Sequence, residues 1–202
     1  LATFPEIKLG NYKKIAHKVL GERKEMKVDQ KEIDQTLEWI RNSRKGSLPA
    51  GRQGEKVPEL NEDFAKSLGK FQNVEELKKS VADGLLMEKQ MKETDRLRLK
   101  ILDEVIKSSE IDLPEVMVDK TYENMRKQLE PMLKAAGKSE EEIKRELRER
   151  ARNNVVSNLV IYKIAQTEKL EPKPEEIDEK GDYQYNYGVI QQNKVFGFLE
   201  KQ

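Results

Sequence analysis

The chain has 202 residues, 38% of them charged and 36% hydrophobic, and its 39 Lys and Arg residues almost balance its 38 Asp and Glu residues. This balance lacks the basic excess of nucleic-acid-binding proteins and the large net charge of disordered chains. The absence of Cys and the single histidine, His17, exclude disulfides, thiol nucleophiles and multi-histidine metal sites.

No run approaches 18 apolar residues, so the sequence predicts no membrane span. The absence of Cys fits a reducing compartment. A low apolar fraction with abundant Glu, Lys, Leu and Met predicts long helices with narrow buried stripes. We therefore expect an elongated all-α protein.

The first twenty residues differ from the rest of the chain. Pro5 and nearby β-branched residues favour extended backbone, so we predict a strand or extended linker over 12–19. No partner for such a strand is evident later in the sequence, and the chain begins without Met. We therefore expect 1–20 to be a remnant of a preceding domain, in which His17 has a structural role.

Capping signals predict where the helices begin. Asp29 with Glu32 is a capping box and predicts a helix over 29–41. The Gly-, Pro- and Ser-containing stretch 42–56 has no apolar period and predicts a flexible loop. Apolar residues at helical spacing predict four further helices, over 61–69, 73–108, 114–137 and 139–169.

The three long helices are joined by short connections, so we expect them to pack antiparallel. Ser139 and Glu142 form the clearest capping box in the chain. Pro172 and Pro174 end the last long helix. Segment 181–188 shows no helical period, and 189–199 predicts a short final helix.

Five of the six methionines lie on two long helices that we expect to be neighbours: Met87, Met91, Met117, Met125 and Met132. Methionine is flexible and polarizable, so it suits surfaces that accept many apolar shapes. The same residues also suit an irregular core. The pattern alone is compatible with both interpretations.

Motifs for covalent chemistry are absent. The sequence contains no phosphate-binding glycine loop and no nucleophile elbow. Glu140–Glu142 begin a helix, where carboxylates interact favourably with the helix dipole. The basic residues of 144–152 alternate with Glu146 and Glu149, which is typical of a solvated helix face. We predict no catalytic residue, no metal and no cofactor.

Four segments resemble the bacterial trigger factor family. Phe4–Tyr12 (FPEIKLGNY) resembles the segment that enters its helical body. Val57–Gly69 (VPELNEDFAKSLG) is similar to the signature that re-enters that body. Leu113–Glu115 resembles its L-P-E step, and Asn193–Lys201 resembles its terminal helix. Together these segments extend the resemblance over nearly the whole chain.

The chain also departs from the family pattern. The family commonly carries a peptidyl-prolyl cis-trans isomerase domain where this chain has only loop 42–56. The ribosome-docking loop is absent and would belong to a missing N-terminal domain. The tail after Glu171 is shortened, and Tyr183–Tyr187 has no family counterpart. The resemblance therefore implies a helical chaperone body without isomerase activity in this chain.

The resemblance implies an all-α, elongated bundle of antiparallel helices with arms, preceded by a short extended segment. Residues 21–202 would form a helical chaperone domain that holds nascent or unfolded polypeptides in an apolar cradle without covalent chemistry. Our candidate contact residues are Met87, Met91, Tyr122, Met125, Leu129, Met132, Phe196 and Phe198.

Other interpretations stay open at this point. They are a SurA-type periplasmic chaperone, the helical part of a prolyl isomerase, and a passive scaffold with one fixed partner. The trigger factor resemblance implies a cytoplasmic protein that binds unfolded chains, reaches ribosomes only through a missing domain, and binds neither nucleic acid nor membrane. A homodimer is compatible with this interpretation.

Overall fold

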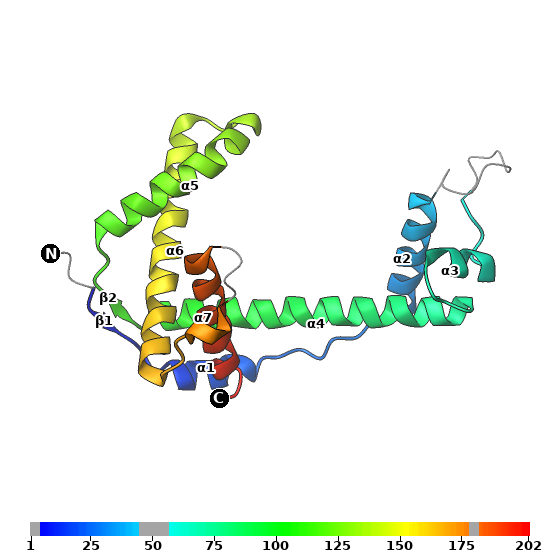
Figure 1. Ribbon diagram of the computed structural model, residues 1–202, viewed down its shortest axis with the longest axis horizontal. Coiled ribbons are helices and arrows are strands. Elements are labelled where there is room, and N and C mark those ends of the chain that lie inside the picture. Colours follow the sequence, from blue (N-terminus) through cyan, green and yellow to red (C-terminus); the bar gives the residue numbers. More distant parts are fainter. Residues whose placement is uncertain (1–4, 45–56, 178–181) are drawn as a thin grey trace. The chain divides into compact units, whose positions relative to one another are not determined.

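The computed structural model describes residues 5–44, 57–177 and 182–202 (Figure 1). Helices dominate these residues, so the predicted all-α class is confirmed. In chain order the elements are β1 (Ile7–Lys8), α1 (Tyr12–Leu20), α2 (Gln30–Ser43), α3 (Glu62–Leu68), α4 (Val74–Lys107), β2 (Glu110–Ile111), α5 (Glu115–Ala135), α6 (Glu140–Glu168), the 3-10 turn η1 (Pro174–Glu176) and α7 (Tyr183–Leu199).

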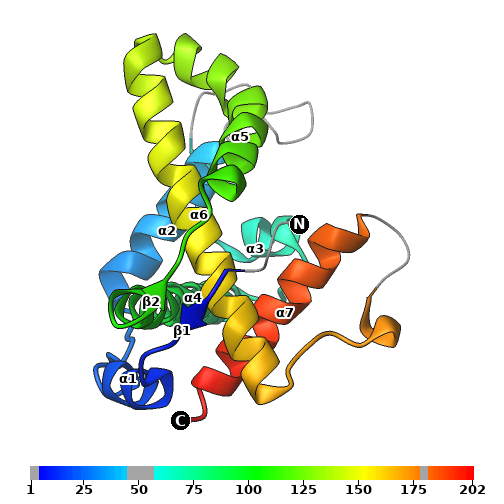
Figure 2. The ribbon, with the colours of Figure 1, turned by 90° about the vertical axis from the view of Figure 1, so that its left-hand side faces the viewer.

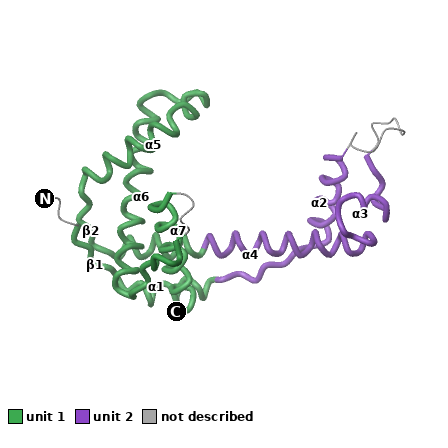
Figure 3. Tube along the Cα trace, viewed as in Figure 1, with its two compact units in different colours: residues 1–22, 97–202 green, residues 23–96 purple. Residues whose placement is uncertain are grey.

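The chain divides into two compact units, shown in Figure 3. Unit 1 comprises residues 1–22 and 97–202, and unit 2 comprises residues 23–96. Helix α4 therefore contributes its first part to unit 2 and its last part to unit 1. Residues 5–22 pack with segments from the C-terminal half of the chain. Most of the predicted loop 42–56 lies outside the described residues.

The predicted strand over 12–19 is wrong, because this segment is helix α1. The Asn11 side chain accepts a hydrogen bond from the backbone N–H of Lys14 at 3.0 Å and so caps the helix. Ala16 and Val19, three residues apart, point into the core of unit 1. Helical spacing and a cap outweighed the β-branched composition of this segment. His17 lies on the exposed face of the same helix.

The short strand β1 does have a partner, β2. The two strands pair antiparallel, with Ile7 opposite Ile111. After β1 the chain passes very close to the end of α4, where a Cβ built on Gly10 would lie 2.8 Å from the Ser108 carbonyl oxygen. The backbone N–H of Gly10 also donates to Ser109 Oγ at 3.1 Å. These contacts attach the N-terminal segment to unit 1.

The main core of unit 1 brings together segments from both ends of the chain. Its buried residues come from α1, the last part of α4, α6 and α7: Ala16, Val19, Leu97, Ile101, Val105, Val160, Ile161, Ile164, Ala165, Val195, Phe196 and Leu199. Helix α7 begins earlier than predicted, at Tyr183 rather than 189. Asp182 caps it by accepting hydrogen bonds from the backbone N–H groups of Gln184 and Tyr185.

Helices α5 and α6 form an antiparallel hairpin, visible in Figure 2. The capping box of Ser139 and Glu142 begins α6 as predicted. Apolar contacts among Leu133, Ile143 and Leu147 hold one end of the hairpin. The expectation that α5 neighbours α4 is wrong, because the principal partner of α5 is α6.

Unit 2 has its own small core, formed by Leu37, Phe64, Ala65 and Leu77. The capping box of Asp29 and Glu32 begins α2, and Asn61 caps α3 through the N–H of Phe64, as predicted. Across the described residues, no helix is long and apolar enough to cross a bilayer.

Candidate functional site

Helix α6 packs against both α5 and α7 in unit 1 (Figure 2). A surface groove is lined by residues of these three helices. Its volume is about 360 Å³. We call it the amide groove, and its lining residues are Met117, Thr121, Asn154, Val155, Asn158, Leu159, Ile161, Tyr162, Gly188, Gln191 and Gln192. The volume is within the usual range for ligand-binding clefts.

Apolar side chains form the base of the amide groove, and uncharged polar side chains surround them. Val155 and Leu159 are buried one turn apart on α6, and Met117 of α5 packs against them. Asn154 and Asn158 have the same one-turn spacing, and Asn158 Nδ2 donates to Asn154 Oδ1 at 3.0 Å. This site was not predicted from the sequence. Val155 with Leu159, and Asn154 with Asn158, are each four residues apart, and this spacing indicates an apolar and a polar stripe side by side on one helix.

Helix α5 carries four of the predicted contact residues. Met132 is 61% exposed, and it therefore presents its side chain to solvent. Tyr122, Met125 and Leu129 are half-buried against the apolar end of the hairpin. The sequence pattern did not identify Val116 on the same helix, which is 67% exposed.

The two predicted contact residues of α7, Phe196 and Phe198, pack in or against the core of unit 1. Phe196 is 4% exposed in the unit 1 core, and the Arg98 guanidinium lies 5.5 Å from its ring centroid. Its assignment as an exposed client contact is therefore corrected, because a buried ring offers no area to a ligand. Phe198 is half-buried, with Lys13 Nζ 5.4 Å from its ring centroid.

Met87 and Met91 lie on the part of α4 that belongs to unit 2. They are 63% and 57% exposed, respectively. Trp39 of α2, in the same unit, is also exposed and was not among the predicted contacts. Because the methionines of α4 and those of α5 belong to different units, we treat them as two separate apolar surfaces.

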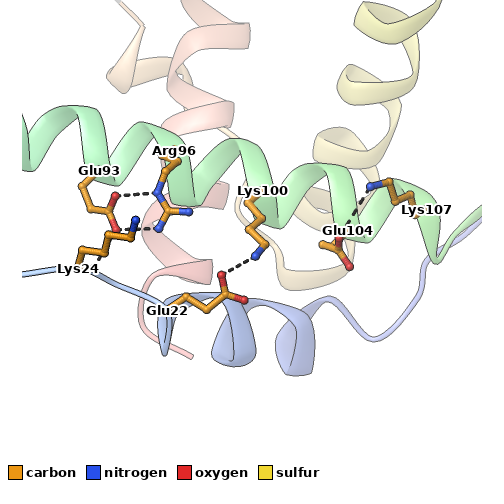
Figure 4. A network of polar contacts seen from close by, with 7 residues as sticks. All are labelled: Glu22, Lys24, Glu93, Arg96, Lys100, Glu104 and Lys107. Atoms are coloured by element: carbon orange, nitrogen blue, oxygen red, sulfur yellow. Dashed lines mark hydrogen bonds and ion pairs between the residues drawn. The ribbon is translucent and has the colours of Figure 1, made fainter.

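Charged side chains mostly stabilise local structure. Figure 4 shows Glu93 of unit 2 accepting hydrogen bonds from the Arg96 guanidinium, at 2.7 and 2.8 Å, and from the backbone N–H of Lys24 at 2.9 Å. These bonds lower the pKa of Glu93 from its ordinary value of 4.5 to about 2, with the bond from Arg96 as the largest cause. In unit 1, Glu22 pairs with Lys100.

The lowered pKa of Glu93 predicts an acid-sensitive contact in unit 2. The contact stabilises the folded unit above pH 4.5, and this contribution disappears as the pH falls toward 2. Urea denaturation of the wild type should therefore show a larger loss of stability across this interval than denaturation of Glu93→Gln. Parallel pH profiles for the two proteins would contradict the assignment.

Another partly buried polar contact joins Tyr12 and Glu168, both in unit 1. The Tyr12 hydroxyl donates to Glu168 Oε1 at 2.5 Å, and Lys13 Nζ lies 2.8 Å from the same oxygen. Burial and the adjacent carboxylate raise the pKa of Tyr12 to about 12. The hydrogen bonds of Lys13 and Tyr12 lower the pKa of Glu168. This cluster joins α1 to the end of α6.

The described residues are thus mainly helical, and their distinctive surface features are exposed apolar side chains and a neutral groove. Residues 73–202 match the family model described as the C-terminus of the bacterial trigger factor protein. Because this match covers more than half of the 202 residues, the chain belongs to the bacterial trigger factor family. The family predicted from the sequence motifs is confirmed, in preference to the SurA-type alternative.

Similar proteins agree with this assignment. The trigger factor of Clostridium kluyveri is 33% identical over 135 residues, which cover 61% of this chain and 31% of that protein. The trigger factor of Halothermothrix orenii is 32% identical over 157 residues, which cover 72% of this chain and 37% of that protein. The chain thus matches about a third of the length of these curated relatives.

A solved structure of similar fold is consistent with this assignment. It is described as "Promiscuous Substrate Recognition in Folding and Assembly Activities of the Trigger Factor Chaperone". The similarity covers 98% of this chain and 73% of that chain, with a TM-score of 0.50 and 16% sequence identity. At this level of identity, the comparison supports the fold.

Proposed function

We propose that this chain is the polypeptide-binding body of a trigger-factor-type chaperone, which holds unfolded or nascent chains and delays their aggregation. The observation that carries the proposal is the exposure of large apolar side chains in a family of chaperones. Three of the predicted contacts, Met87, Met91 and Met132, are more than half exposed. Tyr122, Met125 and Leu129 offer smaller, half-buried surfaces on α5, the helix that carries Met132, and Phe198 offers one on α7.

The physical mechanism is weak apolar contact with rapid release. Burying one methionine side chain contributes about 1.5–3 kcal/mol, and association itself costs at least about 4 kcal/mol. A few such contacts therefore leave weak binding, in the millimolar range and at best approaching micromolar. Flexible thioether side chains adapt to different client sequences, which favours general over specific recognition.

The test replaces Met87, Met91 and Met132 together with glutamine, which keeps side-chain length and helix propensity. Because all three side chains are exposed, the variant should remain folded. We expect at least about a tenfold loss of affinity for a reduced and alkylated, permanently unfolded client. Fluorescence anisotropy would measure that affinity, and light scattering would measure suppression of client aggregation.

A matched control replaces Glu88, Lys92 and Lys127 with glutamine. These exposed side chains lie on the same two helices and carry charge instead of apolar area. The control should bind the client within about twofold of the wild type, since exposed ion pairs contribute little. Equal binding by the methionine variant and the wild type, with both folded, would refute the proposed contact surface.

The remaining alternatives make different predictions. An isomerase function predicts turnover of a proline peptide in a protease-coupled assay, whereas we propose binding without catalysis. A passive scaffold predicts one partner, whereas a chaperone should cross-link to several unrelated unfolded clients. We propose a cytoplasmic location on the basis of the family.

A further inference from the structure

The amide groove is distinguished by its neutrality. None of the described residues that line it is charged, although 38% of the chain is. By contrast, the hollow beside Tyr122 on the α5–α6 hairpin is lined largely by Glu123, Arg126, Glu130 and Lys144. A groove without charges is poorly suited to ions, nucleotides or phosphates, each of which requires compensating charge.

Gln191 supplies a polar group that the fold leaves unused. The residue is 7% exposed, and its side-chain Nε2 is buried without a hydrogen-bond partner. A buried donor without a partner is destabilising, so such a group in a folded protein requires an explanation. Gln191 also lines the groove, so its side-chain amide lies next to the space that a ligand would occupy.

Gly188 also lines the groove, and its missing side chain leaves open space there. It lies one turn before Gln191 and Gln192 on α7, and a Cβ built on it would meet no atom within 4 Å. The exposed ring of Tyr185 precedes it by three residues on the same helix. Room for a ligand therefore coincides with the unused donor.

We propose that the amide groove binds an extended main-chain segment of a client, with Gln191 Nε2 donating to a client carbonyl oxygen. A small apolar side chain of the client would lie beside Met117 and Tyr162, which line the groove and are only half-buried. Peptide groups combine a donor and an acceptor without net charge, and side-chain amides match both. This inference rests on the proposed function and adds main-chain recognition to the apolar contacts of the exposed methionines.

The first experiment replaces Gln191 with leucine, which has similar volume and no donor. The probe is a fluorescently labelled, acetylated and amidated Gly-Leu-Ala-Leu-Gly peptide, compared with the same peptide carrying an ester in place of its central amide. We expect Gln191→Leu to weaken binding of the amide peptide about fivefold and to raise the thermal midpoint of unfolding. Weaker peptide binding together with higher thermal stability would show that Gln191 serves ligand binding, because loss of a structural residue would lower both.

The ester peptide makes the test specific to main-chain recognition, because an ester carbonyl is a weaker acceptor. The wild type should bind the ester peptide several-fold less tightly than the amide peptide, and Gln191→Leu should show a much smaller difference. Equal discrimination by both proteins would overturn the proposed hydrogen bond.

The second experiment fills the groove without removing a native contact. Gly188→Leu places a side chain in the open space, and Gly197→Leu is the matched control on the same helix, where a Cβ also meets no atom within 4 Å. Both substitutions should improve helix propensity. Only Gly188→Leu should reduce peptide affinity, by about tenfold or more; equal affinity for both variants would place the peptide elsewhere.

The outcomes distinguish this inference from the proposed function. If the groove variants bind the peptide normally while the triple methionine variant loses client binding, the groove inference fails and the chaperone proposal stands. If the wild type binds neither the peptide nor the unfolded client, both fail. If groove variants lose peptide binding and keep the wild-type fold, the inference is supported.

Discussion

Replacing Phe196 with alanine should destabilise unit 1 by about 3–5 kcal/mol. The ring is buried with Val195 and Leu199 in a core that also contains residues of α1, α4 and α6. Removing it leaves a cavity that the helices can fill only in part, and it removes the ring beside the Arg98 guanidinium. Urea denaturation followed by circular dichroism would measure the loss.

Tyr185→Ala is a suitable control, because this aromatic residue lies on the same helix and is exposed. Its effect on stability should stay within about 0.5 kcal/mol. The opposite result would be a Phe196→Ala variant with the stability of the wild type and weaker client binding. The ring would then be a contact residue, as predicted from the sequence, and would not stabilise the core.

Leu147→Ala should have a comparable effect on the α5–α6 hairpin, about 2–5 kcal/mol. The Leu147 side chain is fully buried between the two helices, with Leu133 and Ile143 as its neighbours. Leu147 is the most deeply buried apolar side chain at this end of the hairpin, so its truncation should open the structure locally. Hydrogen exchange should report faster exchange in α5 and the first half of α6.

Val116→Ala provides the comparison, because Val116 is exposed on the same hairpin and its truncation leaves no cavity. Its exchange rates should match those of the wild type. Unchanged protection of α5 in Leu147→Ala would mean that the ion pairs of Arg148 and Arg152 with Glu115 suffice to hold the hairpin. Such pairs are exposed and are expected to contribute little.

Local signals in the sequence predicted most helices well. The capping boxes at Asp29 and Ser139 depend on residues only three apart, so a short window contains the whole interaction. The end of α5 was equally readable, because Gly137 adopts a left-handed backbone with φ of 79° that favours glycine.

The errors arose where the decisive signal was subtle or distant. Segment 12–19 looked extended by composition, although Asn11 was an available helix cap. The partner of β1 lies about a hundred residues away along the chain, and no local pattern announces such a pairing. Similarly, the start of α7 at Tyr183 was not predicted, because its three tyrosines give no helical apolar period.

The candidate site was predicted only in part. Helical spacing placed the methionines on the correct helices, but exposure depends on which neighbour covers each face. Thus Met132 is exposed while Met125 is half-buried on the same helix. Phe196 and Gln191 are buried by contacts among distant segments, and the lack of a partner for the Gln191 amide emerges only from the three-dimensional structure.

The division of the chain has a consequence for the order of folding during synthesis. Unit 2 is formed by one continuous stretch, 23–96, so it can fold as soon as that stretch has left the ribosome. Helix α1 is synthesised earlier, yet Ala16 and Val19 bury their side chains in a cluster that includes Val195 and Leu199. The core around α1 can therefore be completed only after α7 has been synthesised, and until then the face of α1 that carries Ala16 and Val19 is covered only in part.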